Sequence, residues 1–300
     1  MRGALAIIGA GRVGRALGRR LHELGWKIGA VVTQSEGSAR KAVRFIGAGK
    51  GHATLSRDVL ASRVILICTP DDAVVRVAGE LARIGAEELR GKVVLHTSGA
   101  LNSSALKAVR ACGADVGSMH PLQSFSGVRV PPLDGKVFAI EGDPPAVRLA
   151  RQITRALGGL PVQIAGDRKA LYHTAAAFAA GHELAIEEAS VRLLMLAGMK
   201  RGEAVRALLQ LTRQVLENFE RLGPRAAWTG PLSRGDHGVI AAHLAAMKPL
   251  PGEFAKAYTS LNDLALLLLS PDSAALSTAA NDLRVSSNKR LKAESAGGTA

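Results

Sequence analysis

A complete G-x-G-x-x-G motif near the N-terminus constrains the fold of this chain more than any other feature. The motif, Gly9-Ala10-Gly11-Arg12-Val13-Gly14, follows an apolar segment at 5–8 and opens a segment whose apolar residues recur with helical spacing up to Leu24. In such a strand–turn–helix unit the first glycine permits a tight turn, the second lets the backbone approach a pyrophosphate, and the third lets helix and strand pack closely. The free N–H groups of the helix start also favour phosphate. The motif therefore predicts a dinucleotide-binding βαβ unit.

The end of the second expected strand indicates which dinucleotide binds. NAD-binding proteins usually place an acidic residue there for the ribose 2′-hydroxyl. This chain has Thr33-Gln34-Ser35, with Arg40 and Lys41 shortly after. Without a carboxylate to repel a 2′-phosphate, the sequence favours NADP, with Arg12 as a further cation; alternatively, Arg40 and Lys41 are ordinary surface cations and Glu36 is the acid. The residues expected to bind NADP(H) are Gly9, Ala10, Gly11, Arg12, Val13, Gly14, Thr33, Ser35, Arg40, Thr69 and Pro70.

The distribution of apolar runs predicts two domains. Short Val/Ile/Leu-rich runs alternate with helical stretches in the first half, which is typical of a mostly parallel sheet. Expected strands lie at 5–8, 28–32, 64–68, 93–96, 115–118, 137–140 and 162–164, and expected helices of the second half at 168–196, 202–222, 237–247, 252–269 and 273–283. The predicted fold class is α/β, a Rossmann doubly wound, mostly parallel sheet followed by an all-helical C-terminal domain. The expected ranges are 1–165 for the Rossmann domain, 166–286 for the helical domain and 287–300 for a flexible tail.

Polar residues after three expected strands should line a ligand crevice, because ligands bind at the carboxyl ends of parallel strands. Thr69 and Pro70 follow one strand, and Ser98 follows the next as a possible hydrogen-bond donor to substrate. His120 follows a third strand with Gln123 and Ser124 beside it, a polar cluster that packing does not require. A core histidine bonded to the backbone is the alternative for His120.

The helix that opens the second half carries Lys169, His173, Ala176 and Ala180 on one narrow stripe. A lysine and an imidazole one turn apart can polarise a carbonyl or imine while hydride arrives. A surface lysine with a capping histidine is the alternative. Arg234 lies in a later loop and suits a substrate carboxylate; there the alternative is a structural turn in which Asp236 caps the next helix.

Composition excludes several other classes of protein. The 300 residues are 47% hydrophobic and only 3% aromatic, which counts against platforms for base stacking. The net charge of +14 sits mainly in residues 1–165 but as single cations, so we expect no nucleic-acid partner. The two cysteines are isolated in the sequence, so we expect no disulfide. Two histidines have a spacing that does not suit a metal site. We expect no membrane span, no targeting segment and a cytoplasmic location.

Four sequence blocks together resemble a known family. These blocks are 96–99 (His-Thr-Ser-Gly), 120–125 (His-Pro-Leu-Gln-Ser-Phe), 169–173 (Lys169 to Tyr172-His173) and 229–236 (Thr-Gly-Pro-Leu-Ser-Arg-Gly-Asp). With the glycine motif they are similar to the 6-phosphogluconate dehydrogenase-like superfamily, and more specifically to the Rossmann-like family with a C-terminal domain of unknown function numbered 2520. The resemblance implies an NADP oxidoreductase. Lys169 matches the lysine of the β-hydroxyacid dehydrogenases in that superfamily, but His173 stands where they have asparagine.

The predicted function is therefore that of an NADP-dependent oxidoreductase, which moves hydride to or from a small, anionic carbonyl, imine or hydroxy substrate. We expect Lys169, His173 and His120 to be catalytic, and Ser98, Gln123, Ser124 and Arg234 to bind the substrate. The chain is expected to form a homodimer through its helical domain. A dinucleotide-binding sensor or scaffold without turnover is the alternative function.

Overall fold

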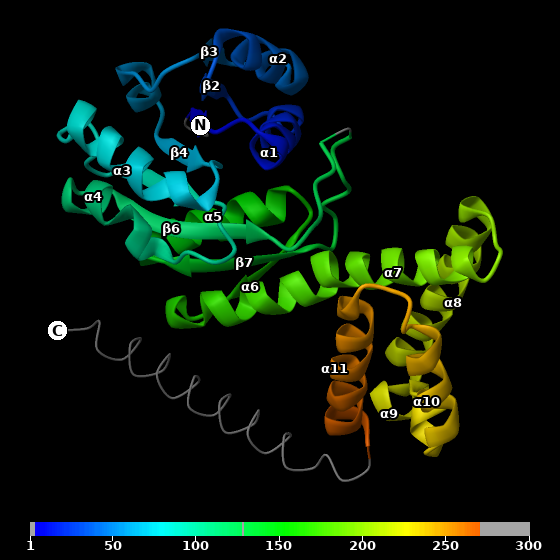
Figure 1. Cartoon of the computed structure of the whole chain (residues 1–300). Helices are drawn as coiled ribbons and strands as arrows, with labels where there is room; N and C mark the ends of the chain where they lie inside the picture. Colours follow the sequence, from blue (N-terminus) through cyan, green and yellow to red (C-terminus); the bar gives the residue numbers. More distant parts are fainter. Residues whose placement is uncertain (1–3, 128, 271–300) are drawn as a thin grey trace, which may run out of the picture. The chain divides into compact units, whose positions relative to one another are not determined.

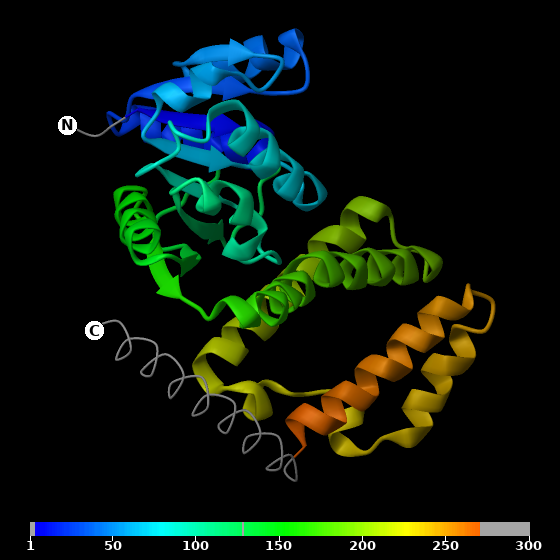
Figure 2. The same cartoon turned by 90° about the vertical axis from the view of Figure 1, so that its left-hand side faces the viewer.

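A computed structural model of the chain describes residues 4–127 and 129–270. Its N-terminal part, coloured blue to green in Figure 2, is built on one eight-stranded sheet with the order β3-β2-β1-β4-β5-β6-β7-β8. The strands are β1 (Leu5–Ile8), β2 (Ile28–Val32), β3 (Lys50–His52), β4 (Val64–Ile67), β5 (Val93–His96), β6 (Asp115–Pro121), β7 (Val137–Gly142) and β8 (Leu160–Gln163). Only the β6–β7 pair is antiparallel. The predicted doubly wound, mostly parallel sheet is confirmed, and its strand order reverses between β1 and β4, where such sheets bind ligands.

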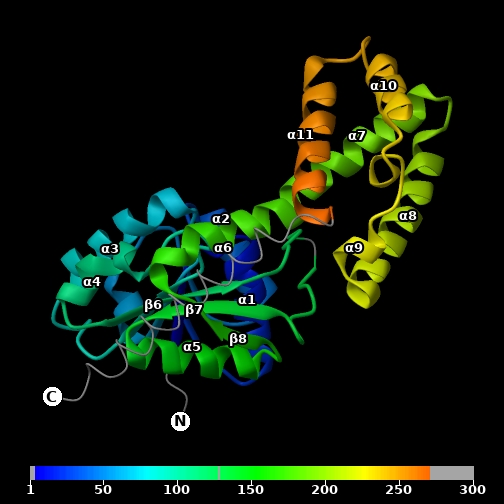
Figure 3. The ribbon, with the colours of Figure 1, turned by 90° about the horizontal axis from the view of Figure 1, so that it is seen from below.

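Helices cover both faces of this sheet (Figures 1 and 3). One face packs against α1 (Arg12–Glu23), α2 (Glu36–Ile46) and α5 (Pro144–Ala156). The other packs against α3 (Asp71–Gly85) and α4 (Lys107–Ala111). Alternate strand residues face the two layers: Ile7 contributes to the first core and Ile8 to the second. The strands are therefore buried on both faces, as their continuous apolar runs indicate.

Local chemistry explains where the first helices of the N-terminal part begin and end. The Ser35 hydroxyl accepts a hydrogen bond from the Ser38 amide and so caps the start of α2. Gly47 ends that helix with φ of 86°, a left-handed conformation that favours glycine. In contrast, no side chain caps α1 at Gly11, and the first turn of α1 contains no acidic residue. The start of α1 is thus left open to an external anion.

The structure corrects several expected strand limits. β3 was not expected, because Lys50-Gly51-His52 carries no apolar alternation; this short strand pairs only with β2 at one edge of the sheet. β8 lies at the other edge and begins at Leu160, since an edge strand accommodates Pro161. β4 ends at Ile67, one residue before the expected end, and both β6 and β7 extend further than expected.

The chain divides into two compact units, Met1–Ala180 and Gly181–Ala300. The first unit includes the sheet and α6 (Lys169–Ala177), whose first residue is buried, so this unit extends past the boundary expected at residue 165. The second unit is helical as predicted, over its described part. Its helices are α7 (Glu183–Leu196), α8 (Arg201–Leu222), α9 (Pro224–Ala227), α10 (His237–Ala246) and α11 (Gly252–Leu269). The expected helix at 273–283 and the expected flexible tail lie outside the described residues.

The expected single helix at 168–196 is interrupted. A π-helical turn, Phe178–His182, separates α6 from α7, and it contains the boundary between the two units. Such turns widen a helix by one residue per turn and shift the phase of the side chains that follow. The stripe expected along this helix therefore holds for α6 but does not continue unchanged into α7.

The second unit leaves most of its apolar side chains in contact with solvent. Among its residues up to 270, only Val191, Ala204 and Met247 are buried. Leu184 is 71% exposed and Leu196 69% exposed, although both lie on helices. Within the described residues, no helix combines the length and the hydropathy that crossing a membrane requires.

Candidate functional site

The glycine loop after β1 forms a cradle that other residues could not form. Gly9 has φ of 87°, and a Cβ atom there would lie 2.6 Å from the Thr69 amide nitrogen. A Cβ atom at Gly14 would lie 2.5 Å from the Gly9 carbonyl oxygen. In contrast, a Cβ atom at Gly11 would meet nothing within 4 Å. The first and third glycines are thus required by packing, whereas the second faces open space at the uncapped start of α1, where a pyrophosphate would approach.

The residues between these glycines point in different directions. Ala10 is buried in the core and Val13 packs against it, so both serve mainly to fix the helix on the sheet. Gly11 and Arg12 are exposed. Of the four inner residues of the predicted motif, Gly11 and Arg12 are therefore the two that are exposed to solvent.

A cavity of about 170 Å³ opens beside the glycine loop and brings together predicted residues from three strand ends. Gly9, Thr33, Thr69 and Pro70 all line it. The remaining lining residues are Ile8, Val32, Gln34, Ala53, Leu55, Ala73, Arg76, Val77 and Glu80. The Thr69 hydroxyl is buried without a hydrogen-bond partner among the described residues, and a buried polar atom of this kind is costly unless a ligand or water pairs with it. The cradle and this hydroxyl fit a dinucleotide.

Of the residues expected at a 2′-phosphate, only Thr33 lines this cavity. The Thr33 hydroxyl donates to the Ser35 carbonyl oxygen at 3.0 Å, and the Ser35 hydroxyl is used in capping α2. Both hydroxyls therefore shape the turn. Arg12 and Arg40 are exposed, and neither belongs to the cavity wall. Arg12 and Arg40 are the two cations among the residues predicted to bind the phosphate, and both are exposed to solvent.

Arg15 of α1 connects the glycine-loop helix to the segment that follows β6. Its guanidinium group donates a hydrogen bond to the Gly127 carbonyl oxygen and lies 5.0 Å from the centre of the Phe45 ring. Gly127 has φ of 84°, and a Cβ atom there would lie 3.0 Å from Arg12. The segment at 122–127 is thus held against α1 by a close approach that a larger residue would obstruct.

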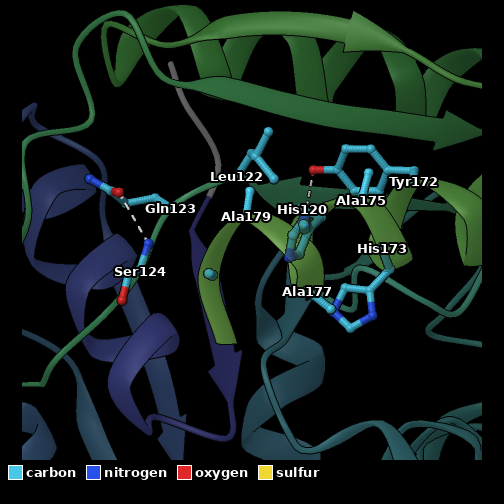
Figure 4. Close-up of a pocket in the computed structure, with 11 residues that line it drawn as sticks. His120, Leu122, Gln123, Ser124, Tyr172, His173, Ala175, Ala177 and Ala179 are labelled. Carbon is cyan, nitrogen blue, oxygen red and sulfur yellow. Dashed lines mark hydrogen bonds between the residues drawn. The ribbon is translucent and has the colours of Figure 1, made fainter. Parts of the chain in front are cut away.

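A larger pocket, of about 590 Å³, lies between that segment and α6 (Figure 4). Its polar lining residues are His120, Gln123, Ser124, Tyr172 and His173. The apolar lining residues are Leu122, Ala175, Ala176, Ala177, Ala179 and Ala180. The structure therefore brings together the predicted residues His120, Gln123, Ser124 and His173, and the alanines of α6 keep the space between them open.

Three aromatic rings meet on one side of this pocket (Figure 4). His120 Nδ1 lies 2.8 Å from the Tyr172 hydroxyl oxygen. The rings of His120 and His173 are perpendicular, with centroids 5.9 Å apart. Gly99 fits against both imidazoles: a Cβ atom there would lie 2.4 Å from His173 Cδ2 and 2.9 Å from His120 Nε2. The glycine of the 96–99 block is therefore part of the pocket's construction.

Lys169 lies behind the pocket and does not line it. Its ammonium group donates to the Ser98 carbonyl oxygen at 2.6 Å and to the Ser118 hydroxyl at 2.5 Å, and the residue is 1% exposed. The Ser98 hydroxyl accepts hydrogen bonds from the Ala100 and Leu101 amides, so Ser98 shapes its own turn. Neither Lys169 nor Ser98 belongs to the lining of the substrate-sized pocket.

Burial and nearby charge shift the pKa values of this region. Desolvation, together with the charges of Lys169, His173 and His96, lowers the pKa of His120 to about 4. Desolvation also lowers the pKa of Lys169 to about 8, against the opposing effects of the Glu141 and Asp71 carboxylates. Burial raises the pKa of Tyr172 to about 12. At neutral pH His120 is therefore an uncharged imidazole beside a protonated phenol.

Arg234 belongs to the second unit and is already paired. Its guanidinium group lies 2.9 Å from the Asp236 carboxylate within the same loop, and both side chains are exposed. Asp236 accordingly makes no capping hydrogen bond to α10. No cluster of three or more potential metal ligands occurs among the described residues.

Sequence reasoning did not select two residues that shape the pocket, Tyr172 and Gly99. One signal for Tyr172 was available: the chain has only two tyrosines, and this one precedes a histidine on the helix stripe. The close approach of Gly99 to two imidazoles required the tertiary structure, because its partners come from β6 and α6.

Comparisons with known proteins agree with this architecture. Residues 1–121 match the Rossmann-like domain model, and residues 136–264 match the model described as a domain of unknown function (DUF2520). No curated protein matches the chain. The chain therefore belongs to the family that joins a Rossmann-like domain to a DUF2520 domain, which confirms the resemblance of its sequence blocks.

Solved structures share the fold across most of the chain. The "putative NADP oxidoreductase BF3122" of Bacteroides fragilis is 21% identical, with a TM-score of 0.72 over 87% of this chain and 97% of that one. Protein TM1727 of Thermotoga maritima is 25% identical, with a TM-score of 0.62 over 87% and 96%. A reductive aminase of Aspergillus terreus, solved with NADPH and ethyl-5-oxohexanoate, is 16% identical, with a TM-score of 0.65 over 89% and 94%.

Proposed function

We propose that this protein is an NADP-dependent oxidoreductase that transfers hydride to or from a small carbonyl, imine or hydroxy compound. The observation that carries the proposal is the convergence of Gly9, Thr33, Thr69 and Pro70 on one cavity beside an uncapped helix start. The structural neighbours support it, since they include a "putative NADP oxidoreductase", a reductive aminase solved with NADPH and an imine reductase solved with NAD+. The cofactor, when bound, supplies or accepts the hydride.

The residues of this chain would hold the cofactor and prepare the substrate. The amides at the start of α1 and the space at Gly11 would hold the pyrophosphate. Arg12 and Arg40 would pair with a 2′-phosphate, beside the turn shaped by Thr33 and Ser35. His120 and His173 would face the substrate's polar atom, with Gln123 and Ser124 opposite. We assign Lys169 and Ser98 to positioning, because both lie outside the pocket lining.

The negative charge expected on the substrate lacks a partner in the pocket. No lysine or arginine lines it, and Arg234 is paired with Asp236. The substrate is therefore best sought with matched pairs of charged and neutral compounds. Reduction of neutral ketones alone would remove the anionic expectation, whereas a preference for carboxylates would require a cation that is not among the lining residues of this pocket.

Calorimetric titration with NADPH and NADH tests the cofactor assignment. NADPH is expected to bind at least tenfold more tightly, a difference of about 1.4 kcal/mol. Arg40→Ala should weaken the binding of NADPH but not that of NADH. The matched control is Arg44→Ala, one turn further along α2, which should change neither affinity. Thr33→Asp should remove the preference, because its carboxylate would repel the 2′-phosphate.

Three outcomes would contradict parts of this proposal. Equal affinities for NADPH and NADH in the wild-type protein would refute the 2′-phosphate assignment. No binding of either dinucleotide would refute the function, and binding without turnover would favour a sensor.

We also propose that the chain forms a homodimer through its helical unit. The exposed apolar side chains of α7 and α8, including Leu196 and Leu211, support this proposal because monomeric proteins rarely leave such areas in water. The mass of Leu211→Glu measured by sedimentation should decrease toward that of a monomer. Leu160→Glu, on the exposed edge strand of the first unit, is the control and should leave the mass unchanged. A monomeric wild-type protein would contradict the proposal.

A further inference from the structure

The chain contains two tyrosines, and each is hydrogen-bonded to a histidine. In the pocket, Tyr172 and His120 have perpendicular rings 5.5 Å apart, with 2.8 Å between the hydroxyl oxygen and Nδ1. In the second unit, Tyr258 and His243 have perpendicular rings 5.8 Å apart and the same 2.8 Å distance. The second pair lies outside the pocket, so it is a matched reference for the first.

The chemistry of the two groups decides which one donates. A phenol is a good donor and a poor acceptor, whereas the unprotonated nitrogen of a neutral imidazole is a good acceptor. His120 is neutral because it is desolvated and because Lys169, His173 and His96 oppose its protonation, which lowers its pKa to about 4. Tyr172 keeps its proton because burial raises its pKa to about 12. The Tyr172 hydroxyl therefore donates to His120 Nδ1, and the imidazole proton resides on Nε2.

Gly99 lies beside the Nε2 atom of His120 and, having no side chain, leaves space next to that atom. A side chain at Gly99 would begin 2.9 Å from Nε2, so the absence of that side chain keeps the atom accessible. No described residue forms a hydrogen bond with Nε2, and His120 is only partly buried in the pocket wall. The fixed N–H group is thus available to a ligand.

We propose that Tyr172 is a positioning residue that holds His120 as the Nε2–H tautomer, so that His120 donates a hydrogen bond to the carbonyl oxygen of the substrate. This inference rests on the proposed oxidoreductase function and names its substrate class. A carbonyl oxygen has lone pairs that accept this bond, whereas the nitrogen of a protonated iminium ion has none. The site therefore suits ketones and aldehydes better than iminium ions.

The role of His120 in the reduction is electrostatic. Hydride from NADPH forms the new C–H bond, the π electrons of the C=O bond move to oxygen, and water then supplies the proton that completes the alcohol. The Nε2–H group stabilises the negative charge that develops on oxygen, as a preorganised donor does without first being ionised. Tyr172 acts in this step through its hydrogen bond to His120.

Long-range ¹H–¹⁵N spectra of the full-length protein, labelled at histidine, test the tautomer without cofactor or substrate. At pH 7.5 the His120 signals, assigned with His120→Gln, should show a protonated Nε2 and an unprotonated Nδ1. In Tyr172→Phe they should shift toward a mixture of tautomers. Tyr258→Phe is the matched control and should change the His243 signals alone. A proton on Nδ1, a charged ring at pH 7.5, or unchanged His120 signals in Tyr172→Phe would each overturn the proposal.

Kinetics provide the second readout, with ethyl-5-oxohexanoate as the ketone probe. Tyr172→Phe should lower kcat about tenfold or more while the Kd for NADPH changes less than twofold, and Tyr258→Phe should change neither. An unchanged kcat in Tyr172→Phe would overturn the proposal. Failure of the protein to bind NADPH would instead refute the proposed function, and the tautomer spectra would remain decisive for the role of Tyr172.

Discussion

The ammonium group of Lys169 is hydrogen-bonded to the Ser118 hydroxyl of β6 at 2.5 Å, beneath the pocket and not inside it. Its second partner, the Ser98 carbonyl oxygen, immediately precedes Gly99, which packs against the imidazoles of His120 and His173. Lys169 therefore fixes the backbone on which the two imidazoles rest. The superfamily resemblance implied a catalytic lysine, whereas this geometry supports a positioning role.

Replacing Lys169 with methionine should destabilise the protein by about 2 kcal/mol, because the Ser98 carbonyl and the buried Glu141 carboxylate lose a cationic partner. The affinity for NADPH should change less than twofold. Urea unfolding and NADPH titration measure the two quantities, and Lys107→Met, at an exposed position on α4, is the control. Unchanged stability with complete loss of turnover would instead make Lys169 catalytic.

The protein should lose stability as the pH falls from about 6.5 to about 4. Burial lowers the pKa values of both His96 and His120 to about 4, whereas an unfolded histidine titrates near 6.5. Between these values the unfolded chain binds more protons than the folded one, so the free energy of unfolding decreases with decreasing pH. Chemical unfolding at several pH values should show that the free energy of unfolding decreases less with falling pH in His120→Gln than in the wild type. Equal slopes would show that His120 is not kept neutral by the fold.

Gly99→Ala should displace the pocket imidazoles without unfolding the protein. The new methyl group would lie 2.4 Å from His173 Cδ2, and the exposed His173 side chain can move away, at a cost of about 1 kcal/mol. Turnover of the ketone probe should fall at least tenfold, with the Kd for NADPH little changed. In the control Gly79→Ala, on an exposed position of α3 where the methyl group meets nothing, stability should rise slightly. Full activity in Gly99→Ala would contradict the assigned pocket.

Ala176→Phe should fill the pocket that the α6 alanines keep open. The phenylalanine ring would occupy space between α6 and the Gln123–Ser124 segment, so kcat/KM for the ketone probe should fall at least tenfold. The thermal midpoint should stay nearly constant, because Ala176 faces the pocket and not the core. Ala170→Phe, exposed on the same helix and outside the pocket lining, is the control. Equal losses in both variants would indicate a general effect on α6.

The cavity beside the glycine loop could be predicted from the sequence because its determinants are local. A glycine motif, the end of a strand and the start of a helix are adjacent in the chain, and parallel strands bring their carboxyl ends to one edge. Gly9, Thr33, Thr69 and Pro70 therefore came together as expected. The same rule predicts which loop a residue occupies, but not whether its side chain is used within the turn, as happens with Thr33.

The chemistry of α6 could be predicted only in part. Helical spacing correctly places Lys169 and His173 on one stripe, since it gives the angle around the helix axis. It does not give the depth of each turn against the sheet: Lys169 lies over β6 and is buried, whereas His173 is exposed at the pocket. The hydrogen bond between Tyr172 and His120 likewise depends on packing between residues far apart in the sequence.

The hydrogen bond from Arg15 to the Gly127 carbonyl oxygen connects the two cavities of the first unit. One end of the segment at 122–127 carries Gln123 and Ser124, and its other end is anchored to α1, the helix that begins at the glycine loop. The glycine loop and the wall of the larger pocket are therefore joined through α1, and Arg15 is the side chain that makes this connection.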